Sequence, residues 1–256
     1  MPKFFISAFL LFFTIGLKAQ TWELGGNIGG SGYMGDLNQN NPVKVSGYAI
    51  SGFVKRNFDR YLSVKLNYTL GAISAADSNS NNAQFKARNL SFTTTLSEVS
   101  AMGEFNFMEY IPEVGKNRFT PYIFFGVSAV NYFPSTKFNG KTYALRGYKT
   151  EGEKTIYPTT AFSLPYGVGI KYNILGKFTI MADIGYRNPN TDYLDDVSGL
   201  YPAANKSTVF TDRSGQRTGV FIGTPGSQRG DSNPRDTYFF LQVGLSYTFV
   251  TQKCYF

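Results

Sequence analysis

The sequence predicts an all-β protein: an eight-stranded antiparallel transmembrane outer-membrane β-barrel with long extracellular loops. Three observations predict this fold class. Residues 237–249 alternate apolar and polar side chains over a length that suits a tilted spanning strand of about 9–11 residues. Seven earlier segments have strand-like patterns, and the connections between the segments alternate between short and long.

The last segment shows the strand pattern most clearly. A period of two places Leu241 and Val243 on one face and Gln242 and Ser246 on the other. In residues 119–133 both faces are apolar, so the sequence does not indicate which face is outward. The predicted strands span residues 22–34, 45–56, 61–74, 90–107, 119–133, 162–172, 178–187 and 237–249.

The connections follow the order that a bacterial barrel requires. Its periplasmic turns are short, its outer loops are long, and both termini are periplasmic when the number of strands is even. A soluble β-sandwich, the competing fold class, gives no reason for loops to be sorted in this way. Each of the connections 57–60, 108–118 and 173–177 is shorter than the connections on either side of it, which are 35–44, 75–88, 134–161 and 188–236.

The first residues predict export. Lys3 precedes an apolar run over residues 4–17, and Ala19 ends a small-residue cleavage site, which together are typical of a signal peptide. We therefore expect a cleaved signal peptide over 1–19, a barrel over 20–249 and a periplasmic C-terminal tail over 250–256. The predicted location is the cell outer membrane, with both mature termini in the periplasm.

Charged residues occupy inward-facing strand positions. An eight-stranded barrel has an interior just wide enough for side chains to fill. Unpaired buried charges are costly, so these four acids and four bases are expected to pair and form a plug. The predicted interior charge network consists of Glu23, Lys55, Lys65, Glu98, Glu104, Lys171, Asp183 and Arg187.

The composition argues against an enzyme. The chain has no histidine, which removes the commonest general base and metal ligand, and its single cysteine is Cys254 near the C-terminus. We expect no catalytic residue, no cofactor and no metal. Without Lys3 and Lys18 of the predicted signal peptide the net charge falls from +8 to +6, which is mild and spread out and favours outer-membrane lipid as a partner over nucleic acid.

Two short motifs in the last long connection have plain explanations. Asp192, Asp195 and Asp196 form an acidic patch that could bind calcium, but their spacing does not fit an EF-hand loop. We expect a solvated turn there. Residues 229–231 spell Arg-Gly-Asp, a host-adhesion tripeptide, and a three-residue match in a polar loop is most often chance.

Four stretches together resemble the PorG family of Bacteroidetes. They are WELGGNIGGSGYMGDL at 22–37, DYLDDVS at 192–198, RGDSNPRDTY at 229–238 and the terminal CYF at 254–256. The resemblance implies a non-enzymatic outer-membrane component of the type IX protein secretion and gliding machinery. It also implies that the protein docks a periplasmic ring made by a lipoprotein and its ring partner, of the PorK/PorN or GldK/GldN type.

If the resemblance holds, the C-terminal tail is the first candidate for ring binding, because it extends past the last strand. The short turns on the same side of the barrel are further candidates. The tail residues are Val250, Thr251, Gln252, Lys253, Cys254, Tyr255 and Phe256.

Two other functions stay open at this stage. One is a free-standing small barrel of the OmpA or OmpX kind, with outer loops that bind surface ligands or serve a structural role. The other is a barrel enzyme that acts on lipids, which the missing histidine disfavours.

Overall fold

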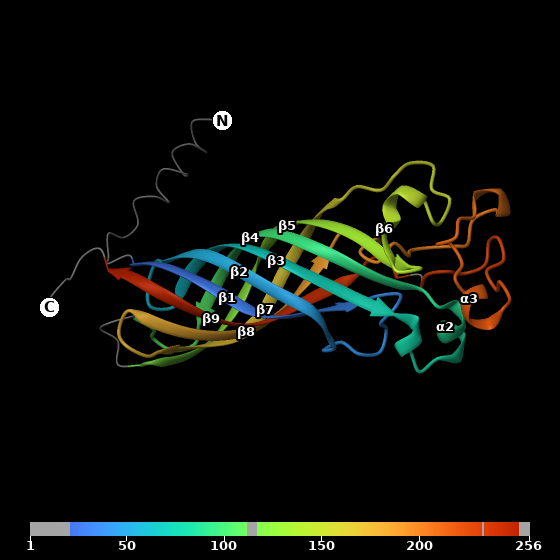
Figure 1. The fold of residues 1–256 in the computed structure, drawn as a ribbon. Helices are drawn as coiled ribbons and strands as arrows, with labels where there is room; N and C mark the ends of the chain where they lie inside the picture. Colours follow the sequence, from blue (N-terminus) through green and yellow to red (C-terminus); the bar gives the residue numbers. More distant parts are fainter. Residues whose placement is uncertain (1–20, 112–116, 232, 251–256) are drawn as a thin grey trace, which may run out of the picture.

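A closed barrel of eight antiparallel strands forms the body of the protein (Figure 1). The computed structural model describes residues 21–111, 117–231 and 233–250. Each strand pairs antiparallel with the next strand of the ring, and the pairing of β1 with β9 joins the first strand to the last. This arrangement confirms the predicted fold class. The barrel strands are β1 (Thr21–Met34), β2 (Val45–Asn57), β3 (Leu62–Ala76), β4 (Ser91–Asn106), β5 (Phe119–Phe138), β7 (Thr160–Asn173), β8 (Phe178–Pro189) and β9 (Thr237–Val250).

The strand ends agree with the predicted ranges to within two residues, except at the end of β5. This strand was expected to stop before Pro134 but continues to Phe138. Its pairing with β7 ends at Asn131 and its pairing with β6 (Lys141–Ala144) starts at Ser135. Between these points one side of β5 has no partner strand, and a proline is tolerated at such an edge.

The outward faces of the strands are apolar, as the alternation predicts. Val243 and Leu241 are about half exposed, whereas Gln242 and Ser246 are buried inside the barrel. The structure also assigns the facing of β5, which the sequence left open: Phe125 points outward and its neighbour Phe124 is buried.

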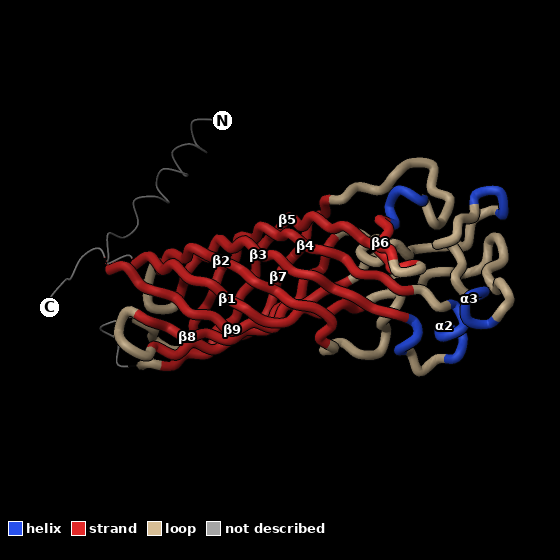
Figure 2. The backbone as a smooth tube through the Cα atoms, viewed as in Figure 1, coloured by secondary structure: helices blue, strands red, loops and turns tan. Residues whose placement is uncertain are grey.

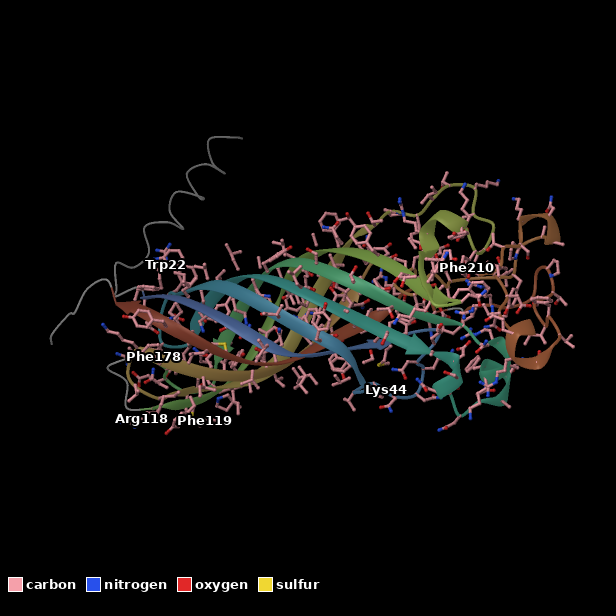
Figure 3. All side chains as sticks on the ribbon, in the orientation of Figure 1. Trp22, Lys44, Arg118, Phe119, Phe178 and Phe210 are labelled. Atoms are coloured by element: carbon pink, nitrogen blue, oxygen red, sulfur yellow. The ribbon has the colours of Figure 1, made fainter. Side chains whose placement is uncertain are left out.

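Aromatic side chains lie on the outer surface near both ends of the strands, as interfacial girdles do in membrane barrels. Figure 3 shows Trp22, Phe119 and Phe178 near the end that carries residues 21 and 250. At the other end the exposed aromatics include Tyr48, Phe133, Phe162 and Tyr166. The band between the girdles is aliphatic and contains Ile28, Leu66, Val99, Val127, Val168 and Val243.

The two ends of the barrel differ strongly (Figure 2). One end, the terminal rim, carries the described chain ends and the short connections 58–61, 107–111 with 117–118, and 174–177. The other end carries the loop cap, which is the described part of residues 35–44, 77–90, 139–159 and 190–236. The cap contains β6 and the short helices η1 (Asp77–Asn79), α2 (Ala83–Arg88), η2 (Leu145–Tyr148), η3 (Ala204–Lys206) and α3 (Gly215–Thr218).

The interior changes character along the barrel axis. Toward the terminal rim it is polar and charged, whereas under the loop cap it is an apolar core to which strands and loops both contribute. This core includes Tyr33, Phe92, Tyr132, Leu194 and Phe240. The cap is therefore packed onto the barrel and belongs to the same folded unit. None of the helices in the described part of the chain is long and apolar enough to cross a bilayer.

A lysine placed in the middle of the aliphatic band should destabilise the barrel in a bilayer. Val243→Lys is expected to lower the free energy of unfolding by about 2–4 kcal/mol, because it puts a charge near the bilayer midplane. Urea unfolding in lipid vesicles measures this change. Leu200→Lys, at a cap residue with the same exposed fraction of 55%, is the control and should have little effect. Equal losses in both variants would contradict a lipid-facing band.

Candidate functional site

Five of the predicted interior charges form one network around Glu104 on β4. Its carboxylate contacts the ammonium groups of Lys171 at 2.6 Å, Lys65 at 3.0 Å and Lys55 at 3.6 Å. Lys55 also pairs with Glu23 at 2.9 Å. Five different strands supply these side chains, so the network links much of the barrel wall through its centre.

The other three predicted charges form two smaller groups. Arg187 pairs with Glu98 at 3.5 Å, and the Tyr238 hydroxyl donates to Glu98 at 2.5 Å. Asp183 accepts a hydrogen bond from the Tyr122 hydroxyl at 2.8 Å. The sequence reasoning missed both tyrosines. Tyr238 lies on the inward parity of β9 and could have been found, whereas the facing of β5 could not be assigned.

All eight predicted charges lie inside the barrel. The most exposed of them is Asp183, at 7%. Each acid has a cationic or hydroxyl partner there, so the four acids and four bases balance one another. Such an interior is a neutral plug, and it offers no excess charge of one sign to attract an ion.

At the loop cap, buried arginines join the loops. Arg88 makes two hydrogen bonds to Asp77, at 2.7 and 2.8 Å, and donates to the Asp36 carbonyl at 3.0 Å. Arg229 pairs with Glu151 at 2.8 Å and donates to backbone carbonyls of the last loop. These two guanidinium groups fix the long loops relative to one another.

The Arg-Gly-Asp sequence at residues 229–231 is not displayed as an adhesion loop. The Arg229 side chain is 3% exposed and is bonded to Glu151 inside the cap. Its guanidinium would have to leave these partners to reach a receptor. The tripeptide is therefore part of the internal structure of the cap.

The acidic patch of the last loop is not a solvated turn, contrary to the expectation from the sequence. Asp195 is 2% exposed and Asp196 is 1% exposed. The Tyr33 hydroxyl donates to Asp195 at 2.5 Å, while Thr150 and Tyr157 donate to Asp196. The prediction was wrong because these donors come from distant parts of the chain, which the local polar sequence does not reveal.

Three carboxylates converge in the cap. Asp36, Asp192 and Asp236, here called the aspartate triad, each place one oxygen within 4.8 Å of the other two. Burial and the nearby negative charge of Asp231 raise the pKa of Asp36 to about 8. Burial raises the pKa of Asp192 to about 6, and burial together with the charge of Asp36 raises the pKa of Asp236 well above its usual range. Carboxylate oxygens in this arrangement are potential ligands for a hard cation.

The cap also contains an open hollow of about 690 Å³. Phe85 and Arg88 of α2 line one side, and Tyr201, Arg229 and Arg235 of the last loop line the other. The hollow is polar and basic, and it lies beside the triad because Gly35 and Asp231 belong to its lining as well.

The predicted ring-binding tail is outside the described residues from Thr251 to Phe256. Val250 is described only as the last residue of β9, where its backbone pairs with Thr21. The predicted signal peptide, residues 1–19, also lies outside the described part of the chain.

Comparison with known proteins identifies a family and similar barrels. A family model described as "Domain of unknown function (DUF6089)" matches residues 2–256. A search of curated proteins gives no match.

Among solved structures, Neisserial surface protein A is 10% identical with a TM-score of 0.45, covering 91% of this chain and 99% of that one. Ail of Yersinia pestis is 12% identical with a TM-score of 0.41, covering 91% and 100%. A major outer membrane protein of Thermus thermophilus is 13% identical with a TM-score of 0.42, covering 91% and 100%. The closed ring, the apolar band and the girdles make this chain an outer-membrane β-barrel protein.

Removing the charge of Glu104 should destabilise the barrel, because three buried lysines would lose their common partner. Glu104→Gln is expected to cost about 3–5 kcal/mol of unfolding free energy, the usual cost of breaking a buried ion pair. Urea unfolding in detergent micelles measures it. The double variant Glu104→Gln/Lys171→Met should lose less than the sum of the two single variants.

Glu109→Gln is the matched control, since Glu109 pairs with Arg60 at the exposed terminal rim. A surface pair contributes at most about 1 kcal/mol. If Glu104→Gln cost no more than Glu109→Gln, the interior network would not be a stabilising element.

Proposed function

We propose that this chain, which belongs to the DUF6089 family, is a non-enzymatic outer-membrane component of the type IX protein secretion and gliding machinery. In this role the barrel anchors a periplasmic ring, formed by a lipoprotein and its ring partner of the PorK/PorN or GldK/GldN type, to the outer membrane. The resemblance of residues 22–37, 192–198, 229–238 and 254–256 to the PorG family is the basis of the proposal.

One structural observation supports an anchoring role over a transport pathway. The barrel interior is filled by balanced charges centred on Glu104 and, under the cap, by an apolar core. A filled barrel has only its outer surface and its two ends available for function. Lipid occupies the outer surface, so a protein partner has to bind at an end.

The terminal rim is the end that suits a periplasmic ring. An even number of strands puts the described ends, residues 21 and 250, on one side of the barrel, and the short turns lie on that side. In bacterial barrels the short turns face the periplasm. The rim exposes apolar side chains on its turns, including Phe58, Met108 and Leu175. Leu175 lies in the connection 174–177 and is 74% exposed, and such a side chain can anchor a protein contact.

The resembling segments also lie together in the fold. Three of them, residues 22–37, 192–198 and 229–238, contribute to the cap and its core through Tyr33, Asp195 and Asp236. The likeness therefore covers residues that depend on one another in space, which favours a relationship over a chance match.

The first test is co-purification at native expression. A tagged full chain should retain the periplasmic ring lipoprotein after detergent extraction, and a deletion strain should lose type IX secretion. A variant that ends at Val250 and a full-length Leu175→Asp variant should both fold, as judged by heat-modifiable gel mobility, and retain less ring protein. Phe221→Asp changes an exposed aromatic residue of the cap and is the matched control, with unchanged ring binding expected.

Normal secretion in the deletion strain would contradict the proposed role. Retention of the ring by both rim variants would contradict the assignment of the terminal rim as the binding surface.

A second candidate is a free-standing small barrel of the OmpA or OmpX kind that binds a surface ligand. The polar hollow of the cap favours it, because the exposed Arg235 lies in its lining. Under this function, Arg235→Glu should abolish binding of an acidic polysaccharide while secretion stays normal. Under the first function, the same variant leaves ring binding unchanged.

A further inference from the structure

The aspartate triad brings together three distant parts of the chain. Asp36 follows β1, Asp192 follows β8, and Asp236 is the residue before β9. One oxygen of each carboxylate lies within 4.8 Å of the other two. The triad therefore joins the first long loop to both ends of the last one.

Negative charge around the triad is not balanced by the neighbouring arginines. Asp195 is linked to Asp236 by the Tyr33 hydroxyl, which contacts both carboxylates, at 2.5 and 3.0 Å. Arg88 hydrogen-bonds Asp36 only at its carbonyl oxygen and gives its ion pair to Asp77. Burying a group of carboxylates without a cation costs free energy, so a bound cation would stabilise this arrangement.

An unpartnered oxygen provides a second and independent observation. Asp36 is 1% exposed, and its Oδ1 already accepts the backbone N–H of Asp231. Its Oδ2 is buried and has no hydrogen-bond partner. Buried polar atoms almost always have partners, and a carboxylate oxygen left without a donor within an acidic group is suited to binding a metal ion.

The Asp236 carboxylate is held in a fixed position. Asp236 accepts the Tyr33 hydroxyl at Oδ1 and the Leu194 backbone N–H, at 2.9 Å, at Oδ2. Each Asp236 oxygen still has a lone pair for a cation, because a carboxylate oxygen accepts about two bonds. Partners of this kind orient metal ligands and raise the affinity of a site.

Two glycines allow the backbone to come close to the triad. A Cβ atom at Gly35 would lie 2.0 Å from Asp236 Oδ1, and one at Gly230 would lie 3.1 Å from Asp36 Oδ1. Any larger residue at position 35 would displace a triad carboxylate. Glycine at positions 35 and 230 thus lets both loops approach closely and leaves room for the carboxylate oxygens of the triad.

We propose that the aspartate triad binds one Ca²⁺ ion, which ties the first long loop of the cap to both ends of the last. Calcium takes oxygen ligands at about 2.3–2.6 Å in flexible geometry, so oxygens on opposite sides of the ion lie about 5 Å apart, which accommodates the 4.8 Å limit. Magnesium demands shorter bonds and near-octahedral geometry, which loop-borne carboxylates satisfy less readily. The ion offsets the charge of the triad and gives Asp36 Oδ2 its missing partner.

Calcium binding to the full chain, folded in detergent, is the direct test. Titration with CaCl₂ in a calorimeter should give one saturable site per chain, with an affinity of about 1 mM or tighter, the weak limit of extracellular calcium modules. Calcium should raise the thermal unfolding midpoint, and chelation should reverse the rise. Absence of saturable binding, or saturable binding of Mg²⁺ alone, would overturn the proposal.

Substitution of the triad locates the site. Asp36→Asn should weaken calcium binding by at least about tenfold, the smallest loss usual for a damaged metal site. This variant should not lose stability without calcium, because Asn keeps an oxygen that can accept the Asp231 N–H and brings no charge into the group. Asp192→Asn should also weaken calcium binding, and it serves as the test variant if Asp36→Asn does not fold.

Glu153→Gln is the matched control, since Glu153 is a cap acid outside the triad whose two carboxylate oxygens are also buried without a hydrogen-bond partner. It should bind calcium as the unaltered chain does. If Glu153→Gln and Asp36→Asn weakened binding equally, calcium binding would depend on the overall charge of the cap. The assignment of the aspartate triad as the calcium site would then be wrong.

Terbium gives a geometric readout. Tb³⁺ occupies calcium sites, and its emission is sensitised by a tyrosine close to the ion. The Tyr33 hydroxyl lies 3.0 Å from Asp236 Oδ1, so excitation of tyrosine should produce terbium emission that CaCl₂ displaces. The emission should fall in Tyr33→Phe. Emission that calcium does not displace, or that is unchanged in Tyr33→Phe, would place the ion elsewhere.

Discussion

Pairing of the buried charges around Glu104 is the constraint on which the rest of the barrel depends. Strand alternation with lipid outside sends every second side chain into an interior that has no room for bulk water. The side chains of Lys55, Lys65 and Lys171 are tolerated there because the Glu104 carboxylate contacts all three ammonium groups. Glu23 is a second partner for Lys55. The paired side chains also fill the barrel interior. The two ends of the barrel are therefore the parts that remain available for binding a partner.

The two ends of the barrel are stabilised by different interactions. At the terminal rim the strands are joined by short turns, and the interior beneath them is polar. At the cap end the loops build a mixed structure in which an apolar core around Tyr33 and Phe240 carries a layer of buried acids and arginines. Bound counter-charges would stabilise this layer, and Asp36 is one place for them, because a buried oxygen of its carboxylate has no donor.

The barrel could be predicted from the sequence because its pattern is local. A period of two fixes the facing of Val243 or Gln242 from its immediate neighbours, and the inward position of Glu104 follows in the same way. The cap could not be predicted, because its contacts join residues far apart in the chain. Asp195 looked solvated from its polar neighbours, yet its partner Tyr33 lies on β1. β5 was ambiguous because its inner face carries aromatic residues such as Tyr122 and Phe124 in place of polar ones.

The pairing of β1 with β9, along Thr21 to Met34, puts the seam of the ring between the two chain ends. The other pairings around the ring join consecutive barrel strands, whereas this one requires residues more than two hundred positions apart to meet. Contacts of such high sequence separation form slowly. Closure therefore has to wait until β9 has been made, and until then β1 presents an unsatisfied edge that has to be shielded against aggregation.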